Sequence, residues 1–319
     1  MSQQIAAYAT MVLTWGLMVF AFLVGLFIFR LEARYLGGYS FAEQASQKDN
    51  PAVIIRFTGT LAALMMATFG AYHVTGEGIL ADFSSAVMAL VCAFIALFVS
   101  RIVNDRFILT HVDNTQAVVK QKNVAVAIVE LFTYLATACV FIGGMQDSSH
   151  GLIYNVVWFA LGQGVLIGLA WIYRLFMSEV FEQIEVKNNC ACALSLGGIL
   201  LSGGIVIGVL IAPASSASFA EDIFALVTSI VAWAVVLLLS KVIINRAMIP
   251  GRTIMKEIKE DANWGFGLMD ASPRSSSPPS SFCFTSTKEV PRADTTSISR
   301  LHLCVCPPCR RRGRKRWAE

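Results

Sequence analysis

The sequence predicts an all-helical, polytopic membrane protein: a bundle of seven complete spans and a truncated eighth, built from a repeated four-helix unit. Its composition, its long uncharged runs and an internal repeat predict this fold class. Of the 319 residues, 56% are hydrophobic and only 14% are charged. A water-soluble core cannot bury that much apolar side chain, so the composition indicates a membrane protein.

Seven uncharged runs approach or exceed the roughly 20 helical residues that cross a hydrocarbon layer of about 30 Å. We predict one span in each run: 5–29, 57–76, 83–100, 124–146 (with Glu130 as its one charge), 148–173, 188–213 and 223–240. The first run is expected to be a retained helix and not a secretory signal, because no Lys or Arg precedes it and charged residues follow it.

The charges of the loops predict the orientation, because cytoplasmic loops near membrane spans retain Lys and Arg. Four loops carry three, four, two and five of these residues, namely 30–49, 101–122, 174–188 and 241–262. The loops between them carry none: 77–82, 146–151 and 214–222. We therefore expect a multi-pass protein with its amino terminus outside and its longer loops and basic tail in the cytoplasm.

A tandem repeat divides the chain. The segment Arg101-Ile-Val-Asn-Asp-Arg106 matches Lys241-Val-Ile-Ile-Asn-Arg246 at an offset of 140 residues. Each unit has an even number of spans, so the two units are expected to have the same orientation in the membrane. The predicted parts are a first membrane repeat, an incomplete second repeat and a disordered basic tail: 1–147, 148–271 and 272–319.

A short motif marks the cytoplasmic start of each even-numbered helix. It consists of a polar pair, an Asn and then alternating small and apolar residues, as in Gln121-Lys-Asn-Val-Ala-Val-Ala-Ile128. The Asn residues of this helix-start motif are Asn50, Asn123, Asn189 and Asn263. An Asn at this position caps a helix by accepting a hydrogen bond from a free backbone amide. The alternative is that the clustered helix starts attract an anion such as phosphate or an acidic headgroup.

With this motif and two copies of its unit, the chain resembles the YjfL-like family of bacterial inner-membrane proteins, also called domain of unknown function 350. The resemblance rests on the Asn-x-Ala-x-Ala-Ile pattern in its membrane context and covers roughly residues 10–270. It implies a helical fold and an inner-membrane location. It implies no reaction, cofactor or ligand.

Ionisable residues inside the predicted spans form a candidate membrane-embedded site. Glu130 lies seven residues beyond Asn123, about 10 Å into its helix at about 1.5 Å per residue. An ionisable group at that depth is costly and usually faces a partner or a water-filled cavity. Arg56 comes six residues after Asn50. Two interpretations stay open: an internal ion pair between Arg56 and Glu130 that fixes helix packing, and a proton or cation relay.

Further polar residues extend this candidate site. Thr133 and Thr137 continue the helix face of Glu130, and Asp270 occupies the matching place in the second repeat. Asn155 and Gln163 either line a polar path or form interhelical hydrogen bonds. Two patterns of small residues predict close helix packing instead. One is a stripe at helical spacing, Ala191, Ser195, Gly198 and Ser202, and the other is the Gly-x-x-x-Gly of Gly204 and Gly208.

Enzyme motifs are missing from the membrane part: there is no Walker-type loop, no His-Glu-x-x-His and no Gly-x-Ser-x-Gly. We therefore expect no enzyme, no catalytic residue, no metal and no cofactor. The tail is rich in Ser, Pro and Arg, a composition that a reading-frame shift near Asp270 would produce. Its Cys304, Cys306 and Cys309 with His302 are an alternative zinc site, but their spacing fits no standard knuckle. A nucleic-acid partner is not expected.

Two function classes remain open. A channel or transporter for an ion or small solute is favoured by the repeat architecture and by Glu130 with its threonine stripe. A non-conducting scaffold in an envelope-stress or membrane-maintenance role is favoured by the lack of a dense polar lining. The expected surroundings are the lipid bilayer, a second copy in a homo-oligomer, and cytoplasmic protein partners of the longer loops.

Overall fold

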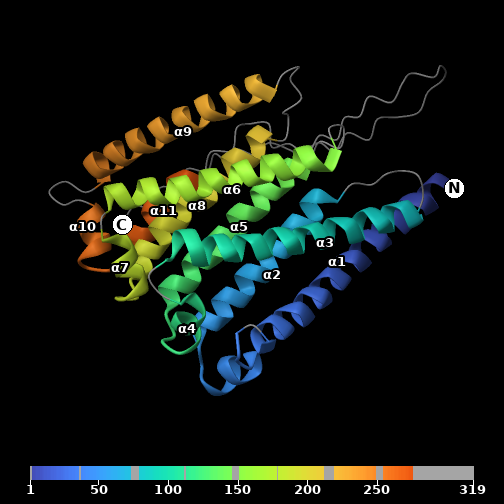
Figure 1. Cartoon of the computed structure of the whole chain (residues 1–319), viewed down its shortest axis with the longest axis horizontal. Helices are drawn as coiled ribbons and strands as arrows, with labels where there is room; N and C mark the ends of the chain where they lie inside the picture. Colours follow the sequence, from blue (N-terminus) through green and yellow to red (C-terminus); the bar gives the residue numbers. More distant parts are fainter. Residues whose placement is uncertain are drawn as a thin grey trace, which may run out of the picture. The chain divides into compact units, whose positions relative to one another are not determined.

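The structure is a computed structural model that describes residues 2–35, 37–72, 79–110, 113–145, 151–177, 179–211, 219–248 and 254–275. These residues belong to one unit of the chain, Met1–Pro279. Every regular element among them is a helix (Figure 1), which confirms the predicted all-helical class. The basic tail from residue 276 onward, with Cys304, Cys306, Cys309 and His302, lies outside the described residues.

Six helices of the described residues are long and apolar enough to cross a membrane. They are α2 (Pro51–Ala71), α3 (Ile79–Val103), α5 (Val124–Met145), α6 (Gly151–Phe176), α8 (Cys190–Ile211) and α9 (Phe219–Met248). Each overlaps one predicted run. The first predicted run lies in α1 (Ser2–Tyr35), so a total of seven spans stays a prediction. Helix α11 (Trp264–Ser275) has 12 residues and runs past Ala271, the predicted end of the second repeat.

Short helical elements occupy the loops that the sequence predicted only as connections. They are the π-helical turns η1 (Glu43–Gln47) and η2 (Asn104–Ile108) and the short helices α4 (Asn114–Val119), α7 (Val180–Glu185) and α10 (Ile254–Lys259). Elements of five or six residues are too short to show a helical period in sequence. Of these, η1, α4, α7 and α10 each come just before one Asn of the helix-start motif.

Four parallel helices form a row through the unit: α2, α5, α8 and α11 (Figure 1). Helix α5 packs against both α2 and α8, and α8 packs against α11. Each row helix begins at its Asn, so these four residues mark one end of the bundle, which we call the Asn end. The other long helices lie beside the row: α1 and α3 contact α2, α6 contacts α5 and α8, and α9 contacts α8.

Small residues set the distance between α5 and α8. A Cβ atom at Gly204 would collide with the backbone of Ala136, and one at Gly208 would collide with the backbone of Cys139. Side chains at these two positions would hold the helices apart, so glycine is what allows the contact. The predicted Gly-x-x-x-Gly of Gly204 and Gly208 therefore faces α5, and Gly198 of the predicted stripe faces Ala271 of α11.

Candidate membrane-embedded polar site

An ion pair between Arg56 and Glu130 lies buried between α2 and α5. The Arg56 Nε and Nη2 atoms donate to Glu130 Oε2 and Oε1, both at 2.5 Å. The side chains of Arg56 and Glu130 are 6% and 1% exposed, so the protein encloses the pair. Two parallel charge-assisted hydrogen bonds are a strong and geometrically specific arrangement for arginine and a carboxylate. The structure therefore gives Glu130 the charged partner that its depth requires.

Polar contacts connect this ion pair to the Asn end. Arg56 Nη2 also donates to the backbone carbonyl of Asn114 at 3.1 Å. The side chain of Asn114 in turn donates from Nδ2 to Asp105 Oδ1 at 2.6 Å. Asp105 is 37% exposed, whereas Asn114 is buried. Asn114 thus connects the surface of the Asn end to the ion pair, through its side chain on one side and its backbone carbonyl on the other.

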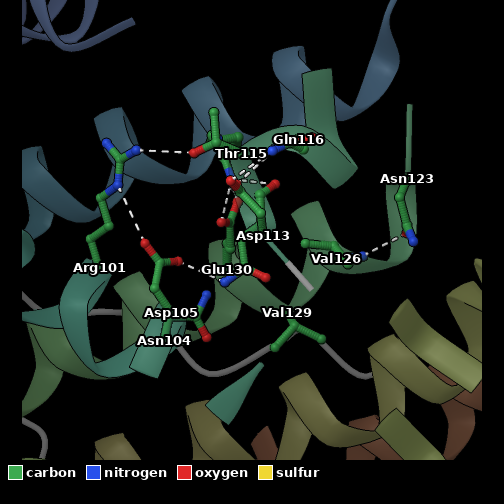
Figure 2. Close-up of polar contacts among 12 residues, drawn as sticks. Arg101, Asn104, Asp105, Asp113, Thr115, Gln116, Asn123, Val126, Val129 and Glu130 are labelled. Carbon is green, nitrogen blue, oxygen red and sulfur yellow. Dashed lines mark hydrogen bonds and ion pairs between the residues drawn. The ribbon is translucent and has the colours of Figure 1, made fainter. Parts of the chain in front are cut away.

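Arg101 belongs to the outer part of this set. Its side chain reaches toward Asp105 and Thr115 (Figure 2), at 3.8 Å from Asp105 Oδ2 and 3.3 Å from Thr115 Oγ1. Arg101 also forms an ion pair with Glu32 of α1. Side-chain exposures of 18% for Arg101 and 28% for Glu32 leave these charges partly hydrated. The Asn end of the first repeat is therefore a charged surface above a buried ion pair.

Deeper in the bundle, hydroxyl and amide groups follow Glu130 along α5. Thr133 Oγ1 donates to the Val129 carbonyl at 2.8 Å and lies 3.5 Å from Asn104 Oδ1. Thr137 Oγ1 lies 2.8 Å from Ser100 Oγ and 3.4 Å from Gln163 Oε1. We call this buried set the polar chain: Arg56, Glu130, Thr133, Asn104, Thr137, Ser100 and Gln163.

Two amide groups of the polar chain lack an acceptor. Within the described part of the chain, no hydrogen-bond partner is present for Asn104 Nδ2 or Gln163 Nε2. Leaving a buried donor unsatisfied costs about 1–3 kcal/mol, and ordered water is the usual partner of such groups. Asn104 begins the π-helical turn η2, a distortion that is frequent at functional sites. Asn104 and Gln163 are therefore the places in the polar chain where a donor remains for a further partner.

The second repeat places different residues at the matching positions. By the repeat offsets of 139 and 140 residues, Ser195 corresponds to Arg56 and Asp270 to Glu130. Ser195 Oγ donates to Asp270 Oδ2, and the Tyr173 hydroxyl lies 2.7 Å from Ser195 Oγ. Asp270 is thus buried between α8 and α11 and does not join Arg56 and Glu130. Both repeats thus have a carboxylate at the same position, but its partner is an arginine in the first repeat and a serine in the second.

The four Asn residues cap the row helices. The side-chain oxygen of Asn50 accepts from Ala52 N at 3.1 Å, and Asn189 accepts from Ala191 N at 3.0 Å. Asn123 accepts from Val126 N at 3.0 Å, as Figure 2 shows. Asn263 accepts from Gly265 N at 3.1 Å. The first three Asn side chains are also buried and donate their NH2 groups to backbone carbonyls, which leaves these side chains with no free donor for an anion.

Two titratable groups of the first repeat that lie outside its spans have shifted pKa values. The backbone amide of Gln116 donates to Asp113, the N-cap of α4, at 3.0 Å and lowers the pKa of that carboxyl. Burial raises the pKa of the Tyr39 hydroxyl, and the charge of Arg56 partly offsets the shift. Tyr39 therefore stays protonated beside the ion pair at neutral pH.

Three buried residues of the site had not been predicted: Ser100 and Asn104 of the polar chain, and Asn114 beside the ion pair. Asn104 lies inside the segment Arg101–Arg106, which indicated only the tandem repeat. The signal available was that an Asn recurs near the same place, as Asn245 in the second copy. Ser100 and Asn114 had no signal of their own, because their role depends on how α3 and α4 pack against α5.

Apolar helices of spanning length that enclose an arginine–glutamate pair define an integral membrane protein. A sequence profile of a known family, Domain of Unknown Function (DUF350), matches residues 3–145 and again residues 147–272. The protein belongs to this family and contains two tandem copies of its domain. No curated protein and no solved structure matches the chain.

Proposed function

We propose that the protein moves an ion across the bacterial inner membrane along the polar chain of its first repeat. The amino terminus would lie outside and the Asn end in the cytoplasm. The depth of the polar chain carries this proposal. Thr137 comes 14 residues after Asn123, about 21 Å along the helix at 1.5 Å per residue. That distance is roughly two thirds of a hydrocarbon layer of about 30 Å.

The chemistry of the polar chain suits a proton or a small cation. Hydroxyl and amide oxygens can coordinate a cation, and hydroxyl groups with water can pass a proton. Water at Asn104 and at Gln163 would supply the acceptors that their amide groups lack. Protonation of Glu130 would release Arg56, and the carboxylate would then pass the proton on, so Glu130 is suited to act as the cytoplasmic entry of the polar chain.

A non-conducting membrane scaffold is the second candidate. The closed geometry of the ion pair favours it, because Arg56 and Glu130 already bond to each other in two places. In this function the pair holds α2 against α5, and the longer cytoplasmic loops recruit protein partners. Neither function includes a chemical reaction.

Flux through purified protein in liposomes tests the first proposal. Proton entry would be followed with an enclosed pH-sensitive dye, and Na+ or K+ entry in parallel with ion-selective dyes. We expect the wild-type protein to exceed protein-free liposomes. Glu130→Gln and Thr137→Val should lower the flux about tenfold or more, which corresponds to about 1.4 kcal/mol of added barrier.

Thr228→Val is the matched control for Thr137→Val. Thr228 lies exposed on α9, and its hydroxyl donates to the Phe224 carbonyl of its own helix at 2.8 Å. This variant should keep the wild-type flux. If the wild-type protein conducts no better than empty liposomes, conduction is refuted and the scaffold remains.

A further inference from the structure

One turn occurs four times at the Asn end. In each copy a short helical element is followed by a residue with positive φ: Asp49, Lys122, Asn188 and Ala262, at 44°, 51°, 52° and 49°. The next residue is the Asn of the helix-start motif, whose backbone N–H donates to the carbonyl six residues earlier. The acceptors are Gln44, Ala117, Gln183 and Glu257, at 3.0, 3.0, 2.8 and 3.1 Å. The four turns are therefore equivalent in structure and not only in sequence.

Each of the first three Asn side chains also bonds to the following turn. Asn50 Nδ2 donates to the Val118 and Val119 carbonyls at 2.9 and 3.2 Å. Asn189 Nδ2 donates to the Ile258 carbonyl at 2.9 Å.

Asn123 Nδ2 makes the corresponding bonds to Ile184 and Glu185, at 3.0 and 2.9 Å. Every acceptor lies five or four residues before the next Asn. The side chains thus form a directional series along the row, from α2 toward α11.

The series is open at both ends. Asn263 is exposed, and within the described residues its side-chain NH2 donates to no acceptor. At the other end, the positions equivalent to Ile184 and Glu185 are Ala45 and Ser46 of η1, by the offset of 139. In the described part of the chain, neither of these two carbonyls accepts a hydrogen bond from a side chain.

Apolar side chains are exposed beside both open ends. Trp264 and Leu268 of α11 are 65% and 44% exposed, whereas their counterparts in α5, Val124 and Ile128, pack against the core. Ile54 of α2 is 42% exposed, whereas its counterpart Ala193 in α8 is fully buried. Each exposed face corresponds to a face that is covered at the junction of the two repeats within the chain.

We propose that a second copy of this chain binds there, head to tail. The start of α11 in one copy contacts η1 and the start of α2 in the next, and Asn263 donates to the Ala45 and Ser46 carbonyls. The contact repeats the one between α5 and the α7–α8 segment. Because all row helices are parallel, the repeated contact keeps both copies in the same orientation in one membrane. Such a head-to-tail contact makes a ring or an open array.

The proposed contact is confined to the Asn end. Deeper in the membrane, α5 approaches α8 over Gly204 and Gly208. The counterparts of these glycines in α2 are Met65 and Phe69, whose side chains keep a neighbouring helix away. The association is therefore weaker than the junction of the repeats, and it must be tested in the membrane and not in dilute detergent. It does not depend on ion conduction.

Cysteine cross-linking in cell membranes provides the test. At the junction within the chain, Ala125 N donates to Asn188 Oδ1 at 2.9 Å. The matching pair between copies is Gly265 and Asp49. Two differently tagged full-length chains without native cysteines are co-expressed, one with Gly265→Cys and the other with Asp49→Cys. A short thiol cross-linker should join them, while neither variant expressed alone should form a dimer.

A single chain with Ala125→Cys and Asn188→Cys is the positive control, because it should close the same link internally. If the internal cross-link forms in this control but the co-expressed chains are not cross-linked, the exposed starts of α11 and α2 do not bind a second copy and the proposal is wrong. Dimers of either variant alone at an equal yield would indicate a symmetric contact and would also overturn it.

Asn263→Asp tests the hydrogen bond itself. Aspartate keeps the oxygen that caps α11 but has no NH2 group to donate. Added to the Gly265→Cys chain, it should lower the yield of the joined dimer about two- to tenfold, as expected for the loss of one or two hydrogen bonds. An unchanged yield would refute the role of Asn263.

Discussion

The Arg56–Glu130 pair should be strongly coupled in stability. Glu130→Leu or Arg56→Met alone leaves one buried charge without its partner, and breaking a buried pair in this way costs about 3–5 kcal/mol. Replacing both residues removes both charges, so Arg56→Met with Glu130→Leu should cost much less than the sum of the single changes. The expected coupling energy is about 3 kcal/mol or more, since two hydrogen bonds to charged groups contribute about 1.5–3 kcal/mol each.

Reversible unfolding in lipid bicelles measures these values as a double-mutant cycle over the wild type, both single variants and the double variant. The exposed pair of Glu43 and Lys48 is the matched control. Its ion pair is 2.8 Å long, but the side chains are 45% and 49% exposed. Surface pairs of this kind contribute about 0–1 kcal/mol. The reasoning is refuted if the coupling of Arg56 with Glu130 is no larger than that of the control pair.

Four further predictions follow from the same structure. Gly208→Ala should destabilise the protein by about 1–3 kcal/mol through overpacking, because the added Cβ would collide with the Cys139 backbone. Gly164→Ala is the control, because its Cβ would lie in open space and should not destabilise the protein. Unfolding in bicelles compares the two variants. Impermeant thiol reagents added to intact cells should miss a cysteine placed at Arg106 and label one at Asp147; labelling at Arg106 would reverse the predicted orientation. The pKa of Asp113 is lowered in the folded protein. The stability that this carboxylate contributes is therefore present above the ordinary carboxyl pKa and is lost as the pH falls through the lowered pKa. The free energy of unfolding, measured from pH 7 to pH 3, should fall less in Asp113→Asn than in the wild type. Resequencing the gene near the codon for Asp270 should reveal a single-base change after which another frame encodes an apolar run of about 15 residues, enough to complete a span. If no frame encodes such a run, the frameshift hypothesis is wrong.

Composition and run length were enough to predict the helical membrane class, because a hydrocarbon layer imposes a minimum length that a sequence shows directly. The contact between Arg56 and Glu130 was also predictable. Both residues stand about two turns after an Asn that begins a row helix, so the two charges were expected at the same depth. A buried charge needs a partner of opposite sign at its own depth, and Arg56 and Glu130 meet that condition for each other.

The rest of the polar chain depends on which helices become neighbours. Ser100 and Asn104 come from the end of α3 and from η2, and Gln163 comes from α6. Sequence spacing relates residues on one helix, such as Thr133 and Thr137, but it does not show which other helix faces them. Gln163 was therefore open to two interpretations until α6 was placed beside α5.

The Asn side chains show the same limit at a smaller scale. The side-chain oxygen acts within its own turn, so the sequence predicted its capping role at every copy of the motif. The NH2 group acts on a backbone carbonyl more than 60 residues away, as from Asn123 to Ile184. A carbonyl leaves no mark in a sequence, because every residue has one. Only the repeated geometry shows that one Asn side chain both caps its own helix and donates a hydrogen bond to the next turn. Substitution of one such Asn therefore tests the cap and the contact between neighbouring row helices together.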